Sequence, residues 1–341
     1  MAVRPGSGVR GDVPTRGGVL RDPAAFLADL EAKPAALRRL ADRLADEDPW
    51  AAVSRAERVV LIGMGSSRYA AGVAATRLRA ASVDAVAEYA SLEAGTPGGP
   101  GTLALGISAS GGTEETVEAL ARHRGAGGVV AALTNVAGSA IAQGTDPVVD
   151  MAAGEETGGV ACRSFQHTLA MLLALEAHLT EDTSSVAVTR WIRAAADATE
   201  DLLARRDAWL DPACALLAEG PATFAIAPAE RLSSAEQGAL MLREGPRRTA
   251  DACESGDWLH VDLYLTKPLD YRALLFAGSR FDPEVMGWMR ERGASVLAVG
   301  GEVADAAATI RYEGDDDDEV ALLSEVLVPE LVAAGVWRRQ G

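Results

Sequence analysis

The chain has 341 residues, of which 48% are hydrophobic and 24% are charged, and both values are typical of a globular protein with about two domains. Its formal net charge of −17 argues against nucleic acid and anionic membranes as partners, because like charges repel. An anionic substrate would therefore have to be held by local geometry rather than by the overall field of the protein.

The first half of the chain alternates strand and helix patterns. Residues 23–46 place apolar and charged side chains at helical spacing and predict one or two amphipathic helices. Apolar runs ending in glycine-bearing turns follow, as in a parallel sheet covered by helices. The predicted strands are 58–63, 84–89, 102–108, 127–135 and 146–151, and the predicted helices are 68–81 and 113–123.

The second half begins with a long helical region and then repeats the α/β pattern. Residues 163–218 contain no glycine and are expected to pack on the first domain and lead into the second. Gly245-Pro246 is expected to end a helix, because proline cannot continue one. The predicted strands are 222–228, 271–279, 294–301 and 309–314, and the predicted helices are 233–244, 282–293 and 319–334.

These patterns divide the chain into four parts. Residues 1–20 are rich in Gly, Pro and Arg without an apolar run, so we interpret them as a flexible leader and not as a signal peptide. We assign a first domain with N-terminal helices to 21–185, a helical linker to 186–218 and a second domain to 219–341. No segment approaches the ~20 consecutive apolar residues that cross a bilayer, so we expect a soluble, cytoplasmic protein.

Cysteine and histidine spacing does not indicate a metal or disulfide site. The three cysteines are widely separated without a C-x-x-C pair, and the four histidines form no H-x-x-x-H pair. We therefore expect no disulfide framework and no metal site. We also expect no cofactor, because an acid–base reaction by side chains does not need one. The acidic run Asp315–Asp318 is interpreted as a solvated loop that favours the start of the next helix, with metal binding as the alternative.

Two Ser/Gly turns carry the strongest indication of a binding site. Gly63–Ser67 and Ser108–Thr113 both follow predicted strands, and ligands of parallel sheets bind beyond the carboxyl ends of the strands. The second turn leads directly into a helix, whose free N–H groups and dipole attract anions. The hydroxyls of Ser108, Ser110 and Thr113 add donors without adding charge. This pattern predicts a phosphate site that needs no lysine.

Two other interpretations of these turns are open. Thr113 would serve only as a helix cap if the other hydroxyls were incidental, although a cap needs one hydroxyl and this turn has three. The first turn contains G-x-G, as dinucleotide-binding folds do. Arg68 stands where their third glycine belongs, which argues against a nicotinamide-dependent dehydrogenase.

Four segments together resemble the sugar isomerase (SIS) domain family. Ile107–Thr113 resembles the family's S-Q-S-G-E-T phosphate loop, and Met64–Ser67 resembles its C-G-T-S loop. Glu156–Phe165 is similar to E-I-G-V-A-S-T-K-A-F, and Gln237–Glu244 is similar to E-G-A-L-K-L-K-E of a second domain. The likeness runs from about residue 25 to 333. It is strongest to the isomerase half of glutamine–fructose-6-phosphate aminotransferase and to stand-alone glucosamine-6-phosphate deaminases.

The resemblance implies an α/β fold of two tandem SIS-type αβα domains with parallel, flavodoxin-like sheets. It also implies that Glu244 transfers a proton between C1 and C2 of the sugar, while His260, which in the family reaches in from a second subunit, opens the ring. A homodimer with shared active sites and a hexose 6-phosphate or aminohexose 6-phosphate ligand follow from it. The implied phosphate- and sugar-binding residues are Ser66, Ser67, Ser108, Ala109, Ser110, Thr113, Gly159 and Arg163.

Departures from the family pattern leave the reaction open. Met241 stands where the family usually has lysine, the family's lysine-bearing tail is not recognised, and Lys33 and Lys267 are the only lysines. No lysine is therefore an obvious candidate to form an imine with the sugar. Proton transfer by a glutamate does not need a lysine. The first hypothesis is a phosphosugar isomerase or aminosugar-phosphate deaminase. The alternatives are a catalytically silent sugar-phosphate sensor and the synthase half of a glutamine–fructose-6-phosphate aminotransferase.

Overall fold

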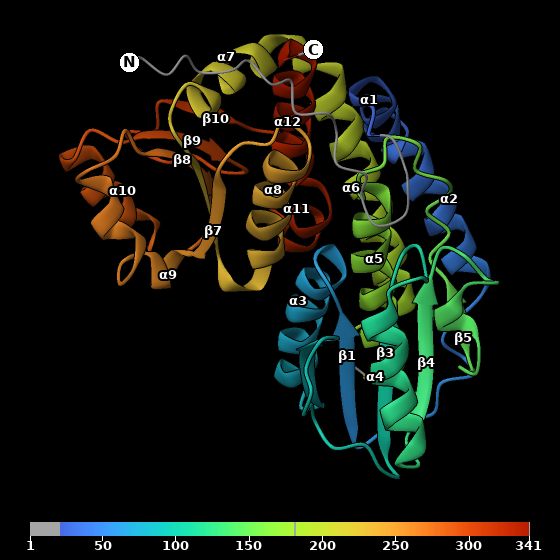
Figure 1. Cartoon of the computed structure of the whole chain (residues 1–341). Helices are drawn as coiled ribbons and strands as arrows, with labels where there is room; N and C mark the ends of the chain where they lie inside the picture. Colours follow the sequence, from blue (N-terminus) through green and yellow to red (C-terminus); the bar gives the residue numbers. More distant parts are fainter. Residues whose placement is uncertain (1–20, 181, 341) are drawn as a thin grey trace, which may run out of the picture.

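Two five-stranded parallel sheets organise the described part of the chain, residues 21–180 and 182–340 of this computed structural model (Figure 1). The first sheet has the order β2-β1-β3-β4-β5, and the second has the order β10-β9-β8-β6-β7. Read from its other edge, the second order is the same as the first, and it is that of flavodoxin-like folds. The predicted α/β class with parallel, flavodoxin-like sheets is confirmed. The predicted leader at 1–20 lies outside the described residues.

The first sheet is built from the apolar runs of the first half of the chain. Its central strands β1 and β3 are buried almost throughout, as expected of parallel strands covered on both faces. The strands are β1 (Arg58–Gly63), β2 (Asp84–Tyr89), β3 (Thr102–Ile107), β4 (Val129–Thr134) and β5 (Val148–Asp150). The helices up to the end of this part are α1 (Pro23–Glu31), α2 (Lys33–Asp46), α3 (Ser66–Ala80), α4 (Glu114–Gly125), η1 (Ala140–Ala142) and α5 (Arg163–Leu179).

The second sheet contains one strand that the sequence prediction missed, β7. This strand lies at the edge of the sheet and contains two acidic residues instead of an apolar run. The strands are β6 (Thr223–Ala227), β7 (Ala250–Glu254), β8 (Arg272–Phe276), β9 (Ser295–Val299) and β10 (Ala308–Ile310). The accompanying helices are η2 (Ala229–Arg231), α8 (Leu232–Glu244), α9 (Ser255–Trp258), η3 (Asp262–Thr266), α10 (Asp282–Glu291), α11 (Asp318–Ser324) and α12 (Leu327–Gln340).

Helices hold the two sheets in one body. The glycine-free region forms α6 (Ser185–Ala204) and α7 (Arg206–Ala218), and α6 packs on α2 while α7 packs on α12. Helix α3 of the first sheet packs on α8 of the second, and α1 packs on α12. One continuous hydrophobic core contains side chains from both sheets, such as Leu61 and Leu274. Figure 1 shows α8 and α12 between the second sheet and the helices of the first.

The C-terminal helical run corrects one expectation. Among the described residues, Asp318–Gln340 is long and apolar enough by composition to cross a membrane, so the expectation that no segment meets this criterion is wrong. However, 89% of its most apolar window is buried inside the protein. Because α12 packs on α1, α7 and α8, this run is a core element of the fold.

Candidate functional site

The two predicted Ser/Gly turns lie at the same edge of the first sheet. They follow β1 and β3, which are hydrogen-bonded neighbours, and the strand order reverses between these two strands. The carboxyl edge at such a point is where parallel α/β sheets bind ligands. The structure therefore brings Ser66 and Ser67 to the same edge as the turn Ser108–Thr113.

The hydroxyls of the second turn have different partners. Ser108 is buried, and its Oγ accepts the N–H of Gly111 at 3.1 Å and lies 3.1 Å from Thr113 Oγ1. Ser110 is exposed, and its Oγ accepts the N–H of Gly112 at 3.4 Å. The Thr113 side chain accepts no N–H of α4 as a cap. The interpretation of Thr113 as a helix cap alone is therefore wrong.

Gly111 sets the shape of this turn. Its φ is +64°, in the left-handed region that favours glycine, and a Cβ there would lie 1.9 Å from Ser139 Oγ. Its carbonyl accepts the N–H of Ile141 at 2.9 Å, and the carbonyl of Ala109 accepts the N–H of Asn135 at 3.1 Å. These two backbone hydrogen bonds anchor the turn to the segments around Asn135 and Ile141, while Ser110 and Gly112 face solvent.

Gln237 on α8 joins the second sheet to this site. Its Oε1 accepts the hydroxyl of Ser66 at 2.7 Å, and its Nε2 donates to the carbonyl of Ala161 at 2.9 Å. Gln237 lies in one of the family-like segments, and the resemblance assigns it no role. The segment match was the available signal, but the contact joins residues 171 positions apart. Ser67, the other predicted sugar-facing serine, lies half-buried on the first turn of α3.

The loop before α5 places Gly159 and Arg163. Glu156 Oε1 accepts the backbone N–H groups of Cys162 and Arg163 at 2.7 and 2.6 Å and so caps α5. Gly159 is half-buried with φ +70°. The Arg163 guanidinium is buried and donates to Asp29 Oδ1 at 3.0 Å, so it already has a partner within the protein. Ligand contact by Arg163 stays a prediction.

Glu244 lies at the last residue of α8, seven positions after Gln237 and on the same helical face, because seven residues span almost two turns. Burial raises the pKa of its carboxyl, and the cations of Arg21, Arg247 and Arg243 oppose that effect. The residue that follows α8 in the turn, Gly245, approaches Trp337 of α12 closely. Glu244 is thus a partly desolvated carboxylate, a suitable state for a proton-transfer base.

His260 does not lie near Glu244 within one chain. Helix α8 ends at the amino edge of the second sheet, where β7 begins, whereas His260 follows α9 beyond the carboxyl end of β7. Its side chain is exposed. Three exposed apolar residues follow close behind, at exposed fractions of 48% for Val261, 68% for Tyr264 and 36% for Leu265.

The corresponding turn of the second sheet is closed by a carboxylate. After β8, Asp282 Oδ2 accepts the N–H groups of Gly278 and Ser279 at 2.8 and 3.0 Å, and this occupies donors that an anion would need. A pocket of about 840 Å³ lies beside it at the ends of β8 and β9. None of the predicted site residues lines this pocket.

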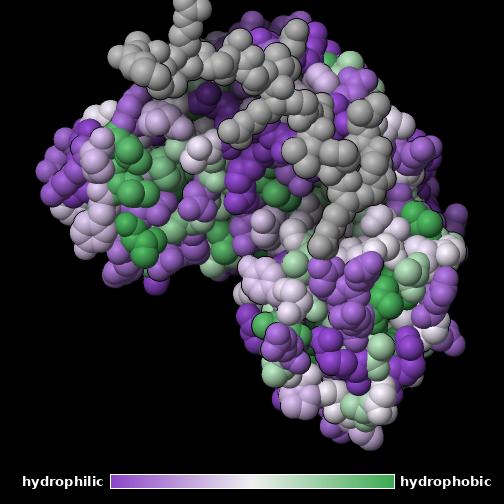
Figure 2. Space-filling view, in the orientation of Figure 1, coloured by the Kyte–Doolittle hydropathy of each residue, from purple (hydrophilic) through white to green (hydrophobic). Residues whose placement is uncertain are grey.

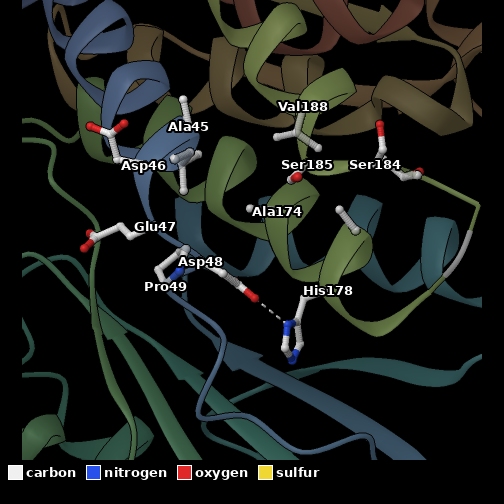
Figure 3. Close-up of a pocket in the computed structure, with 13 residues that line it drawn as sticks. Ala45, Asp46, Glu47, Asp48, Pro49, Ala174, His178, Ser184, Ser185 and Val188 are labelled. Atoms are coloured by element: carbon white, nitrogen blue, oxygen red, sulfur yellow. Dashed lines mark hydrogen bonds and ion pairs between the residues drawn. The ribbon is translucent and has the colours of Figure 1, made fainter.

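A further pocket of about 540 Å³ also lies away from the predicted site (Figure 3). The end of α2 and the start of α6 form it, and His178 Nδ1 lies 2.8 Å from Asp48 Oδ2 at its rim. Figure 2 shows that hydrophilic residues cover most of the visible face, with hydrophobic residues in small scattered groups.

The acidic run at Asp315–Asp318 has structural partners. Asp317 caps α11 by accepting the N–H groups of Glu319 and Val320, so the expected role at the helix start is confirmed. Asp315 pairs with Arg311. Among the residues that the structure describes, no group of three or more His, Cys, Asp or Glu side chains is arranged to hold a metal ion.

Comparison with known proteins establishes the family of the domain that contains the first sheet. The SIS domain model matches residues 52–179, which contain both Ser/Gly turns and all five strands of that sheet. Residues 52–179 are a SIS domain. The resemblance inferred from the sequence is confirmed at this level, and the domain's carboxyl edge carries the candidate site.

Relatives of the SIS-containing chain extend the likeness beyond this domain. Glutamine–fructose-6-phosphate aminotransferase of Aeropyrum pernix is 31% identical over 214 residues, which are 60% of this chain and 34% of that protein. The chain spans between about a third and about half the length of the curated relatives it matches.

Two solved structures share the fold of nearly the whole SIS-containing chain. The C-terminal domain of glucosamine-fructose-6-phosphate aminotransferase from Francisella tularensis has a TM-score of 0.78 at 17% identity and covers 95% of this chain and 98% of its own. Tagatose-6-phosphate ketose/aldose isomerase from Escherichia coli has a TM-score of 0.77 at 16% identity, with 93% of each chain covered.

Proposed function

We propose that this protein is a cytoplasmic phosphosugar isomerase or aminosugar-phosphate deaminase acting on a hexose 6-phosphate or aminohexose 6-phosphate, such as fructose 6-phosphate or glucosamine 6-phosphate. The observation that carries the proposal is the convergence of three segments on one edge of the SIS domain. The hydroxyl-rich turn Ser108–Thr113 and the Ser66 turn lie at neighbouring strand ends, and Gln237 attaches α8 to the second of them. Glu244 lies on the same face of that helix.

Each part of this site has a role in the proposed reaction. The turn Ser108–Thr113 and the start of α4 would hold the phosphate with hydroxyls and backbone N–H groups, which suits a protein of net charge −17. Glu244 would take a proton from C2 or C1 of the open-chain sugar and return it to the neighbouring carbon. The isomerisation balances without a redox partner, because a proton moves from C2 to C1, the hydroxyl proton moves from O2 to O1, and the carbonyl shifts from C1 to C2. Deamination additionally consumes one water and releases ammonia.

We further propose that 219–341 is a second SIS-type domain, joined by the linker 186–218 to the first domain at 21–185. The strand order of the second sheet, which repeats that of the first, supports this division. Because Asp282 closes its turn after β8, this second domain would contribute α8 and His260 to catalysis rather than a second phosphate site.

A homodimer follows from the same proposal. His260 lies far from Glu244 of its own chain, and the exposed apolar residues Val261, Tyr264 and Leu265 beside it suit a subunit contact. We expect inactive Glu244→Gln and His260→Ala proteins to regain activity when mixed, because a hybrid dimer retains one intact site. A monomeric mass by light scattering at the assay concentration, with full activity, would exclude the shared site.

A sugar-phosphate sensor without catalysis is the second candidate. Met241 is fully buried where the family has lysine, and Lys33 is fully buried against Glu330, so neither position offers an amine to a ligand. The same observation weighs against the synthase half of a glutamine–fructose-6-phosphate aminotransferase, for which Lys267 is the remaining lysine. A sensor needs only the phosphate turn.

A substrate panel separates these candidates. The protein is incubated with hexose and aminohexose 6-phosphates while isomer formation and ammonia release are followed, with Glu244→Gln as the control. Isomer or ammonia produced by the wild type and lost in the variant supports the enzyme. Saturable binding by both proteins, with product formed by neither, supports the sensor and overturns the enzyme.

A further inference from the structure

An arginine from the start of the described chain lies against the end of α8. Arg21 Nη1 donates to the Glu244 carbonyl oxygen at 3.1 Å, and Arg21 Nη2 lies 3.6 Å from Glu244 Oε1. The side chains are 19% and 32% exposed, respectively. Arg21 directly precedes Asp22, the cap of α1, so a segment attached to the first domain reaches the helix that carries the proposed base.

Both contacts of Arg21 act on Glu244. The last carbonyls of a helix have no intrahelical partner and carry the negative end of the helix dipole, so a cation there is favourable. The second contact engages one carboxylate oxygen and leaves the other available. Holding both the backbone and the carboxylate of one residue restricts the orientation of its side chain.

The charged groups around Glu244 have unequal effects. Burial raises the pKa of the Glu244 carboxyl, and the cations of Arg21, Arg247 and Arg243 lower it in that order of size. Arg243 and Arg247 belong to α8 and the turn after it, whereas Arg21 comes from another segment. Arg21 is therefore the strongest of these opposing charges.

We propose that Arg21 is a positioning residue that orients the Glu244 carboxylate and favours its charged form. The inference rests on the proposed role of Glu244 as the base. It adds a residue outside the four family-like segments to the candidate site. If Arg21 has this role, the orientation of the Glu244 carboxylate depends on the contact between the start of the first domain and α8.

The first test follows the pH profile of deuterium exchange at C2 of fructose 6-phosphate or glucosamine 6-phosphate in heavy water. The proteins are wild type, Arg21→Gln, Arg21→Lys and the control Arg206→Gln, which removes an arginine that pairs with Glu31 of α1 instead. An opposite charge within ~4–6 Å lowers a carboxyl pKa by ~1–3 units when buried. For this partly exposed pair we expect Arg21→Gln to raise the acid midpoint by about 0.5–1 pH unit, Arg21→Lys less, and Arg206→Gln not at all.

Well above the midpoint, exchange by Arg21→Gln should return to within a few-fold of wild type. A lower rate at every pH with an unchanged midpoint would indicate a merely structural role and overturn the inference. An unchanged profile would overturn it as well.

A second test does not depend on catalysis. Thermal unfolding is measured at pH 8 for wild type, Arg21→Gln, Glu244→Gln and the double variant. Coupled residues should give non-additive changes, with the double variant losing less than the sum of the singles. If wild type binds sugar phosphates but exchanges no deuterium, the proposed function fails while this cycle still tests the pair. Additive changes would show that Arg21 and Glu244 do not interact, and the inference would fail.

Discussion

Ser108 and Ser110 have different roles in the turn Ser108–Thr113. Ser108 is buried and holds the turn through the Gly111 N–H, whereas Ser110 faces solvent with one long contact to Gly112. Gly111 keeps the turn open, because its positive φ and the nearby Ser139 hydroxyl leave no room for a side chain. One serine thus shapes the turn and the other is available to a ligand.

Removing both hydroxyls should weaken ligand binding. A hydrogen bond to a charged group contributes about 1.5–3 kcal/mol. The Ser108→Ala/Ser110→Ala protein should therefore bind sugar phosphate at least ~10-fold more weakly by calorimetry from the loss of the Ser110 bond alone, at ~1.4 kcal/mol per decade, and weaker still because Ser108 no longer holds the turn. The matched control is Ser184→Ala/Ser185→Ala at the start of α6, where binding should be unchanged. Equal affinity of wild type and the first variant would remove the site from this turn.

Sequence alone predicted this turn but not the contacts that complete the site. A serine- and glycine-rich run after a strand is a pattern of neighbouring residues, so it can be recognised directly in the sequence. The Ser66–Gln237 and Arg21–Glu244 contacts join residues 171 and 223 positions apart, and only the packing of α3 on α8 and α1 on α12 creates them. Arg163 is a second example of a contact that the sequence did not reveal. It aligns with a lysine of the family segment, and that alignment gave no sign that its guanidinium pairs with Asp29.

At the scale of elements, the contact between α3 and α8 encloses a carboxyl group. Burial raises the pKa of Glu236 on α8 to about 7, and the opposing charge of Arg68 on α3 does not cancel the effect. Between the ordinary value of 4.5 and about 7, the folded protein holds a proton that the unfolded chain has released. Stability contributed by this group therefore falls as pH rises through that window.

Glu236→Gln should remove this dependence. The variant should melt at a higher temperature than wild type at pH 8 and at a similar temperature at pH 4.5, as measured by circular dichroism. Glu230→Gln, an exposed glutamate of η2, is the control and should retain the wild-type dependence. If Glu236→Gln and wild type show the same change in melting temperature between these pH values, Glu236 does not titrate in this window.

The elements themselves were largely predictable, with an informative exception. Buried parallel strands such as β1 and β3 are continuous apolar runs, and the sequence shows these directly. Strand β7 pairs with β6 on one side only, and two of its five residues, Ala250 and Cys253, are buried while Asp251 is exposed, so no apolar run marks it. An edge strand such as β7 forms because it pairs with a neighbouring strand. That pairing cannot be read from the pattern of residues along the chain.

At the scale of the whole molecule, a buried ion pair joins the two ends of the fold. Lys33 at the start of α2 pairs with Glu330 on α12, and neither side chain is exposed. The pair lies where α1 packs on α12 and so connects the beginning and the end of the described chain. Removing one partner of such a pair leaves an uncompensated buried charge.

Lys33→Met should therefore lower the free energy of unfolding by about 3–5 kcal/mol in chemical denaturation. Lys33→Met/Glu330→Leu should lose much less, because no buried charge remains. The comparison of the single and double variants separates the charge effect from packing. A single variant within about 1 kcal/mol of wild type would show that the pair does not hold the ends of the fold together.

We propose that one site binds a sugar phosphate and moves a proton through Glu244. Deuterium exchange at C2 of fructose 6-phosphate or glucosamine 6-phosphate in heavy water measures that proton directly, even where net conversion is slow. Wild type should exchange, and Glu244→Gln should exchange about 10²–10⁴-fold more slowly while calorimetry shows binding retained. Binding by wild type without any exchange would contradict the enzyme, and exchange undiminished in Glu244→Gln would contradict the choice of base.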